Sequence, residues 1–318
     1  MWLKRHNRNR AKEFRKNKGA FGPFVCTILS MDIFLQLVVS VVIPATVFGL
    51  VALGFTLVAS VCRFLPLAHG ALVLASGYGF YVLTILWPLP PLIAAMIVCV
   101  ATASLGGFIN LVVYERFRGR RSFNAVVALI VAVAVMMIIE NILLLVFGSQ
   151  TKIIPMLLGG SLMVAGAEMT IQESIMVVFV LMLALATGVF WQWSAFGRSA
   201  RAIADNEEAA EILGIDARRI RTLTVGIASA LAAVSGICFA LEYGLQPGLT
   251  TTLAIKAFGR AVVGGIGSIP GAIVGSFFLD IAETSGAWFW NSAYKEVVSF
   301  MVVFLFLLYR PSGIFGKK

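Results

Sequence analysis

The sequence has little charge, few cysteines and almost no histidine, and each shortage excludes a class of protein. Charged residues make up 13% of the 318 residues, whereas about 25% is usual in a soluble domain. The four cysteines, at positions 26, 62, 99 and 238, form no Cys-x-x-Cys pair, and only two histidines are present. Neither a disulfide framework nor a metal site is therefore predicted.

The chain also lacks the sequence patterns of an enzyme. No Ser, Cys or His arrangement has the spacing of a nucleophile and its base, so no catalytic residue is expected. The segment 313–318 is the nearest match to the Gly-x-x-x-x-Gly-Lys-Ser/Thr phosphate loop, and it is too short. We expect no bound cofactor, and any ATP would have to be hydrolysed by another subunit.

What the chain has in abundance is apolar sequence. Hydrophobic residues make up 60% of it, and the mean hydropathy is +0.95. The ranges 37–62, 64–114 and 174–197 contain no Asp, Glu, Lys or Arg at all. About 20 apolar residues suffice for a helix to span a bilayer, and these ranges lack the strict alternation of barrel strands. The predicted fold class is all-α, a polytopic transmembrane helical bundle.

Positive charge lies between the apolar runs. Eight Lys and Arg fall within 1–18, four within 116–121, five within 198–221 and three within 310–318. Such patches are typical of cytoplasmic loops, so we expect lipid and not nucleic acid as the partner of this charge. If all four patches face the cytoplasm, an even number of spans separates each from the next. Eight spans are then predicted, or alternatively ten, with re-entrant or broken segments.

The same pattern predicts the organisation of the chain. Residues 1–20 form a basic cytoplasmic arm that anionic lipid would attract, and 21–318 form the transmembrane domain. One polar segment, 197–220, interrupts the apolar pattern of that domain. Asp205 or Asn206 can cap an internal helix start there, and Gly214 stands where a helix would stop. A helix, a turn and a second helix at the cytoplasmic surface are predicted.

Within the polar segment, Glu208-Ala209-Ala210-x-x-x-Gly214 resembles the EAA loop of ABC importer permeases. In that family the loop contacts the ATPase, so the resemblance implies that these four residues couple the chain to ATP hydrolysis. An exposed Glu208 beside two small alanines would fit a groove on a soluble partner. A merely solvated charged loop is the alternative.

The resemblance extends over most of the chain, to the permeases of the high-affinity leucine, isoleucine and valine import systems. The segments 64–70 (Phe-Leu-Pro-Leu-Ala-His-Gly), 256–258 followed by 263–272, and 309–316 (Tyr-Arg-Pro-Ser-Gly-Ile-Phe-Gly) are similar to segments of that family. The chain departs from the family in its long basic arm, in Leu-Pro-Leu before Ala68-His69, and in Glu140-Asn141, where a neutral pair is expected.

The resemblance implies the permease subunit of an ABC importer for branched-chain amino acids in the bacterial inner membrane. Its implied partners are ABC ATPase subunits, a homologous permease subunit in a homo- or heterodimer, and a periplasmic or lipid-anchored substrate-binding protein. A permease for urea, short amides or a sugar is an alternative, because related permeases share these motifs. An ATP-independent carrier is another, and ATP dependence would distinguish it.

Several ionisable residues fall within the apolar runs, where a charge at the bilayer centre costs about 2.5 to 3.5 kcal/mol. Lys256 and Glu283 are expected to pair across neighbouring helices. Asp280 and Glu283, three residues apart, would serve a proton path together with Glu140 in the carrier alternative. Glu140 is expected either to have an interior partner or to touch the substrate pathway.

The glycine-rich run 264–270 allows two structural interpretations. It can break a helix and expose backbone groups to a translocation path, or glycines at 267, 271 and 275 can let helices pack closely. His69 is expected to hydrogen-bond a loop backbone rather than bind a metal. The candidate residues of the substrate pathway are His69, Glu140, Asn141, Gly264, Gly265 and Gly267.

Overall fold

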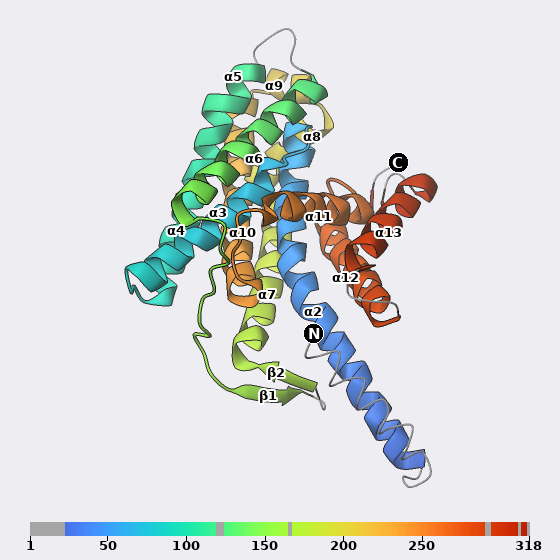
Figure 1. Cartoon of the computed structure of the whole chain (residues 1–318). Coiled ribbons are helices and arrows are strands. Elements are labelled where there is room, and N and C mark those ends of the chain that lie inside the picture. Colours follow the sequence, from blue (N-terminus) through green and yellow to red (C-terminus); the bar gives the residue numbers. More distant parts are fainter. Residues whose placement is uncertain (1–22, 119–123, 165–166, 290–293, 311–312, 317–318) are drawn as a thin grey trace.

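The computed structural model describes residues 23–118, 124–164, 167–289, 294–310 and 313–316 (Figure 1). It is a helical bundle with one antiparallel hairpin, which confirms the predicted fold class. The hairpin strands are β1 (Ser161–Val164) and β2 (Ala167–Thr170). The longer helices are α2 (Pro23–Cys62), α3 (Ala68–Tyr81), α4 (Pro91–Ile109), α6 (Ala125–Phe147), α7 (Ile171–Trp193), α10 (Ala217–Tyr243), α11 (Leu249–Gly264), α12 (Ile269–Phe289) and α13 (Lys295–Tyr309). The shorter helical pieces are the π-helices η1 (Val82–Leu86) and η2 (Asn110–Tyr114), and α5 (Glu115–Arg118), α8 (Ala195–Asp205) and α9 (Glu207–Ile212).

Six helical stretches in the described part of the chain are long and apolar enough to cross a membrane. They are Leu35–Cys62, Ala68–Leu86, Pro91–Arg118, Ala125–Phe147, Ile171–Trp193 and Ala217–Tyr243. A seventh is gained if α11 and α12, which are bent by 112° at their junction, count as one span. The 15 residues of α13 are fewer than the usual length of a span. The eight or ten spans expected from the sequence therefore stay a prediction.

The basic patches divide these helices unevenly. Two candidate spans, α6 and α7, connect the second patch to the third, as expected, whereas α10, the bent pair of α11 and α12, and the short α13 follow the third. Three candidate spans, however, lie between residues 23 and 118, where an even number was expected. The start of α2 consequently lies at the end of the bundle that carries the hairpin, opposite α5 and α9 (Figure 1). The basic arm 1–20 lies outside the described residues, and its cytoplasmic side stays a prediction.

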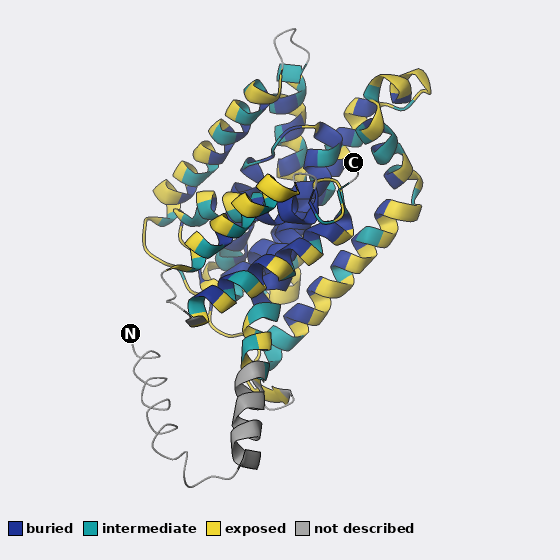
Figure 2. Cartoon of the chain, turned by 90° about the vertical axis from the view of Figure 1, so that its right-hand side faces the viewer, coloured by how far each residue is buried: buried dark blue, intermediate teal, exposed yellow. Residues whose placement is uncertain are grey.

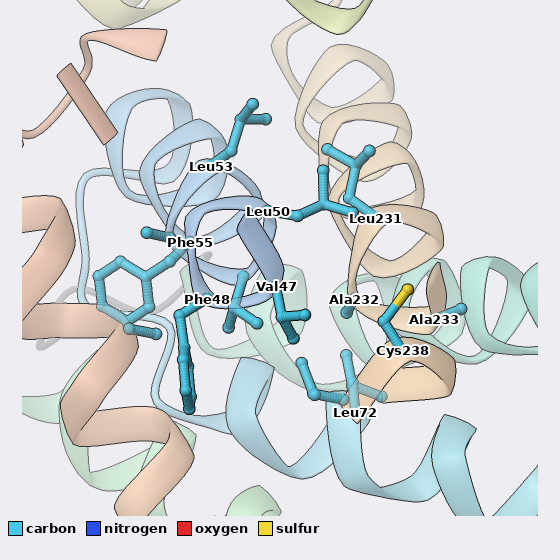
Figure 3. Close-up of a cluster of buried hydrophobic side chains, with 14 of the residues drawn as sticks. Val47, Phe48, Leu50, Leu53, Phe55, Leu72, Leu231, Ala232, Ala233 and Cys238 are labelled. Carbon is cyan, nitrogen blue, oxygen red and sulfur yellow. The ribbon is translucent and has the colours of Figure 1, made fainter. Parts of the chain in front are cut away.

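The core is built around α2 and α10, which pack against each other. In addition, α2 packs on α11 and α12, and α10 packs on α3 and α4. Figure 3 shows Leu50 of α2 pointing toward Leu231 of α10, with Leu72 of α3 beside Cys238. Of the most apolar stretch of each helix, 72% is buried in α10 and 67% in α2. These two helices are therefore surrounded by protein.

The helices α4, α6 and α7 form an outer layer whose apolar side chains face outward. Only 17% of the apolar stretch of α6 is buried, and Leu145 on this helix is 85% exposed. The exposed faces lie on the outside of the bundle and the buried residues at its centre (Figure 2). This inverted surface is the one that lipid or another membrane subunit would cover.

Two helix breaks position the site residues, and they are alike. Arg63 after α2 has φ 55°, and Gly244 after α10 has φ 75°. A proline follows three residues later in each, and its carbonyl accepts a hydrogen bond from the next helix: Pro66 from the His69 N–H at 2.9 Å, and Pro247 from the Thr250 N–H at 3.3 Å. The backbone groups at both breaks thus stay paired.

Candidate functional site

The polar segment 197–220 folds as the sequence suggests, through local side-chain caps. Asn206 ends α8 and caps α9, because its Oδ1 accepts a hydrogen bond of 3.1 Å from the Ala209 N–H. Gly214 follows α9 with φ 83°, a conformation that favours glycine. Asp216 then caps α10 by accepting a bond of 3.0 Å from the Arg219 N–H. A helix–turn–helix results at the end of the bundle opposite the hairpin (Figure 1).

The outer side of α9 is acidic and then apolar. Glu208 and Ala209 are exposed, but Ala210 is only 1% exposed and packs into the core of the chain. Ala210 therefore cannot contribute its side chain to a contact with a partner. Ile212 and Leu213 are 86% and 79% exposed and were missed in the sequence, where two apolar residues before a glycine look like a helix end. They are the apolar counterpart of Glu208 on this surface.

The inner side of α9 is held by charge. Glu207, the first residue of α9, pairs with Arg221 of α10 and, at 3.3 Å, with Arg118 of α5. Arg221 also donates two hydrogen bonds to Glu115, from Nε at 2.7 Å and from Nη2 at 2.9 Å. Arg118 donates to the Cys62 carbonyl at the end of α2. We call Glu115, Arg118, Glu207 and Arg221 the arginine–glutamate network.

The sequence alone did not reveal this network. Arg118 and Arg221 belong to the two basic patches that were interpreted as topological charges. The side chain of Arg221 is 5% exposed and that of Glu115 8% exposed, so both are largely withdrawn from water. The weak signal was the position of Glu115 directly after an uncharged run of 51 residues, 64–114.

Arg63 holds the other half of the polar segment. Its Nη2 donates to the carbonyls of Ala204 and Asp205 at 3.1 and 2.9 Å, at the C-terminal end of α8. A cation at this end of a helix is favoured by the helix dipole. The junction between α2 and α3 is thereby attached to the polar segment.

A second charged cluster is buried among the membrane helices. Arg260 of α11 is fully buried and its Nη2 lies 2.7 Å from an oxygen of Asp280 on α12. The same nitrogen lies 3.6 Å from Glu283, whose other oxygen is 3.4 Å from Nζ of Lys256. The Arg260 guanidinium also stacks 4.2 Å from the ring centroid of Phe48. Two cations and two carboxylates thus form a neutral cluster that joins α11 to α12.

This cluster contains the expected pair of Lys256 and Glu283 and one residue that sequence reasoning missed. Arg260 was overlooked although it stands four residues after Lys256, on the same helix face. Its presence changes the environment of Asp280, which faces a cation rather than Glu283. Both carboxylates are therefore held in ion pairs.

The glycine-rich run does break the helix, between Gly264 and Ile269. The backbone carbonyls at the end of α11 are nevertheless occupied. Val263 accepts a hydrogen bond from the Ile314 N–H at 2.9 Å, and Gly264 accepts one from the Phe315 N–H at 3.1 Å. These carbonyls therefore face the C-terminal segment 313–316 rather than a translocation path.

Close packing also occurs at this break. A Cβ on Gly275 would lie 2.6 Å from the backbone nitrogen of Gly264, and Gly271 also lies against Gly264. Gly265 and Gly267 have φ of 101° and 94°, values that favour glycine. Glycine here permits both the turn and the approach of α12 to α11.

His69 lies in the core between α2 and α3. Its imidazole lies against Gly54 of α2, where a Cβ would come within 2.6 Å of Nε2. It adjoins a cavity of about 20 Å³ that Tyr114 and Ser229 also line. In the described part of the chain, Nε2 of His69 and the hydroxyls of these two residues are buried without a hydrogen-bond partner.

Glu140 and Asn141 lie on the outer layer. Asn141 is exposed on α6 and its amide donates to the Met137 carbonyl of the same helix at 2.7 Å. Glu140 is half-buried, and no described residue donates a hydrogen bond to its carboxylate or pairs with it. The interior partner that the sequence suggested for Glu140 is thus not found among the described residues.

The six candidate pathway residues do not meet in this chain. His69 is in the core, Glu140 and Asn141 are on an outward face, and the three glycines lie at the α11–α12 junction. The residues that do converge are those of the polar segment and the arginine–glutamate network.

Comparisons with known proteins agree with the resemblance seen in the sequence. A family model described as the permease component of branched-chain amino acid transport systems matches residues 37–307. The high-affinity branched-chain amino acid transport system permease protein BraD of Pseudomonas aeruginosa is 34% identical, over 89% of this chain and 96% of its own length. LivH of Escherichia coli K12, which has the same description, is 33% identical over the same shares. Among solved structures, PsaBC from Streptococcus pneumoniae in complex with Fab has a TM-score of 0.42 at 12% identity, covering 96% of this chain and 98% of that chain, which is too low to carry an argument.

Proposed function

Since this chain belongs to the family of branched-chain amino acid transport permeases, we propose that it is the membrane subunit of an ABC importer that carries branched-chain amino acids into the cell. It is a multi-pass protein of the bacterial inner membrane. The observation that carries the substrate class is the match to named relatives over 96% of their own length. Import of urea, short amides or a sugar is not favoured, because these relatives are named for branched-chain amino acids.

ATP hydrolysis is the task of a partner subunit, and the polar segment is the contact with it. Glu208 offers an acceptor for a basic group, while the exposed Ile212 and Leu213 offer an apolar anchor beside it. An exposed apolar pair beside an acidic side chain is a surface that a partner protein can cover. A groove with an apolar floor and a basic rim on the ATPase fits this surface.

Movement of the polar segment would then drive transport. Closure of the ATPase pair pushes α8 and α9 as a lever, and the attached spans rock between outward and inward openings. A substrate-binding protein would dock at the opposite end, where the hairpin β1–β2 lies. The partners are two ATPase subunits, a second permease subunit and the binding protein.

The second permease subunit would cover the outward face of α6. An exposed Asn141 and a half-buried Glu140 without a partner among the described residues are costly against lipid. A neighbouring subunit with a hydrated path between the two would satisfy both. Of the six pathway candidates we retain these two, with Glu140 facing the substrate ammonium, and expect His69 and the glycines to keep the helices packed.

This role of Glu140 predicts a specific defect. Glu140→Gln should lower leucine uptake, because a neutral amide attracts an ammonium group less strongly, while the ATPase subunits still co-purify with the permease. Uptake equal to the wild type would remove Glu140 from the pathway.

The function itself is tested by uptake of radiolabelled leucine in cells with and without this chain. We expect uptake to require the chain and ATP, and unlabelled valine to compete while urea and ribose do not. Uptake that survives ATP depletion would favour a carrier. Competition by urea or ribose would show that the substrate belongs to another class of compound.

A further inference from the structure

The arginine–glutamate network joins the polar segment to several membrane spans at one point. Glu207 belongs to α9, Glu115 and Arg118 to the end of the α4–η2–α5 span, and Arg221 to the start of α10. None of these side chains lies on the surface that we propose for the ATPase. In transport these side chains therefore act through the helices that they join.

Two of the spans are locked together independently of α9. Arg221 holds Glu115 through two hydrogen bonds, and the Asn110 amide donates to the Thr222 hydroxyl at 2.9 Å. Asn110 is buried and lies more than one helical turn below Glu115. These two contacts make the end of the α4–η2–α5 span and the start of α10 one body.

Glu207 is the side chain that attaches α9 to this body. Its two carboxylate oxygens face different arginines, with Oε1 paired to Arg221 and Oε2 paired to Arg118. Its neighbour Glu208 is exposed on the other side, as successive residues of a helix point about 100° apart. One face of α9 is thus available to a partner and the other is bonded to the membrane spans.

Two further bonds extend the connection to α2. Arg118 donates a hydrogen bond to the Cys62 carbonyl at the end of α2. Arg63, which follows Cys62 in the chain, donates to the last carbonyls of α8. The most buried helices of the bundle, α2 and α10, are therefore both attached to the polar segment.

We propose that the arginine–glutamate network is the joint through which movement of the polar segment reaches the α4–η2–α5 span, α10 and α2. The inference rests on the proposed function, in which the polar segment is moved by the ATPase. Glu207, Arg118 and Arg221 are positioning residues, since they touch neither ATP nor substrate. Without the joint, α9 would still follow the ATPase, but less of its movement would reach the spans.

The sharpest test is Glu207→Gln in the complete complex reconstituted into liposomes. This change keeps the shape of the side chain, removes its charge and leaves the Arg221–Glu115 contact intact. We expect the ATPase to remain bound and active, while leucine transported per ATP hydrolysed falls about tenfold, within the range usual for coupling between sites. Arg221→Gln should give at least the same loss, because it also releases Glu115.

Matched controls come from the same helices. Glu211→Gln changes an exposed residue of α9, and Arg219→Gln changes an exposed residue of α10, and neither side chain has an ion pair within the described ranges. Both should keep the wild-type ratio of transport to hydrolysis. The proposed role of the network would be refuted if Glu207→Gln left the ratio of leucine transport to ATP hydrolysis unchanged. It would also be refuted if the ATPase dissociated from that variant.

A second readout does not depend on the substrate. Ile153 is 73% exposed at the hairpin end, so Ile153→Cys, in a background where the four native cysteines are alanine, can report ATP-dependent changes in labelling there. We expect such a change in the otherwise unaltered complex and its loss with Glu207→Gln, whereas its persistence in that variant would overturn the joint. A complex that shows the change but takes up no leucine would refute the proposed substrate alone.

Discussion

At the scale of single residues, each buried charge depends on a partner of opposite charge. Arg260 is fully buried among membrane helices, yet it has a carboxylate at 2.7 Å, another at 3.6 Å and an aromatic face at 4.2 Å. Such a group is tolerated because every charge in its cluster is matched. The cluster stabilises the packing of α11 on α12 only as long as it stays neutral.

Removal of one member should therefore be worse than removal of a pair. We expect Arg260→Met to lower the free energy of unfolding by about 3 to 5 kcal/mol, since it leaves Asp280 with a buried, unpaired charge. Arg260→Met combined with Asp280→Leu should recover much of that loss. Thermal unfolding in detergent would measure both, and a double variant less stable than the single one would contradict the argument.

Gly54 offers a second test at this scale. A Cβ there would lie 2.6 Å from Nε2 of His69 on one side and 3.1 Å from the Ala228 carbonyl on the other. Gly54→Ala should destabilise the chain by about 1 to 3 kcal/mol, the usual cost of overpacking a core. Gly107→Ala is the control, because its nearest contact is 3.9 Å away on Thr222. Equal stability of the two variants would mean that α2 and α3 can separate freely.

At the scale of elements, α9 is a six-residue helix with two different faces. Its sequence carries the family motif, but the structure divides that motif between the inside and the outside of the chain. Ala210 faces inward with Glu207, whereas Glu208 and Ala209 face outward. In the proposed function, this short helix both receives the ATPase and holds the membrane spans.

Disruption of this element should separate ATP hydrolysis from transport. We expect Glu208→Ala combined with Gly214→Pro to abolish ATP-dependent uptake, because proline cannot adopt the φ of 83° that Gly214 has. The chain should still insert, since the altered residues lie outside the spans. Membrane fractionation and leucine uptake would measure the two effects, and normal uptake by the double variant would refute the coupling role.

At the scale of the whole molecule, the two ends of the bundle differ in kind. One end carries the polar segment and the arginine–glutamate network, and the other carries the hairpin and the bridge between Lys152 and Leu245. The basic patch 198–221 lies at the first end. The positive-inside rule predicts that this end is cytoplasmic.

This orientation can be checked with a reagent that does not cross the membrane. Met163→Cys, 76% exposed on β1, should be labelled in intact cells, whereas Arg219→Cys on α10 should be labelled only after the cells are opened. The reverse pattern would invert the bundle and with it the proposed direction of the ATPase contact.

The sequence by itself determined the class of the protein, most helix positions and the family. The uncharged ranges 37–62 and 174–197 predicted membrane helices, and they lie close to the second half of α2 (Pro23–Cys62) and to α7 (Ile171–Trp193). Asn206 and Gly214 were recognised because helix caps act on neighbouring backbone groups. Such features are local, so they can be read along the chain.

Only the tertiary structure decided which charges meet. Arg260 and Asp280 are 20 residues apart, and Arg221 and Glu115 are 106 apart, so no periodicity connects them. The same holds for the burial of Ala210, for the carbonyls of α11 that the C-terminal segment occupies, and for Glu140 on the outward face of α6. Hydropathy shows that a residue lies in a span, but its partner depends on how the helices pack around α2 and α10.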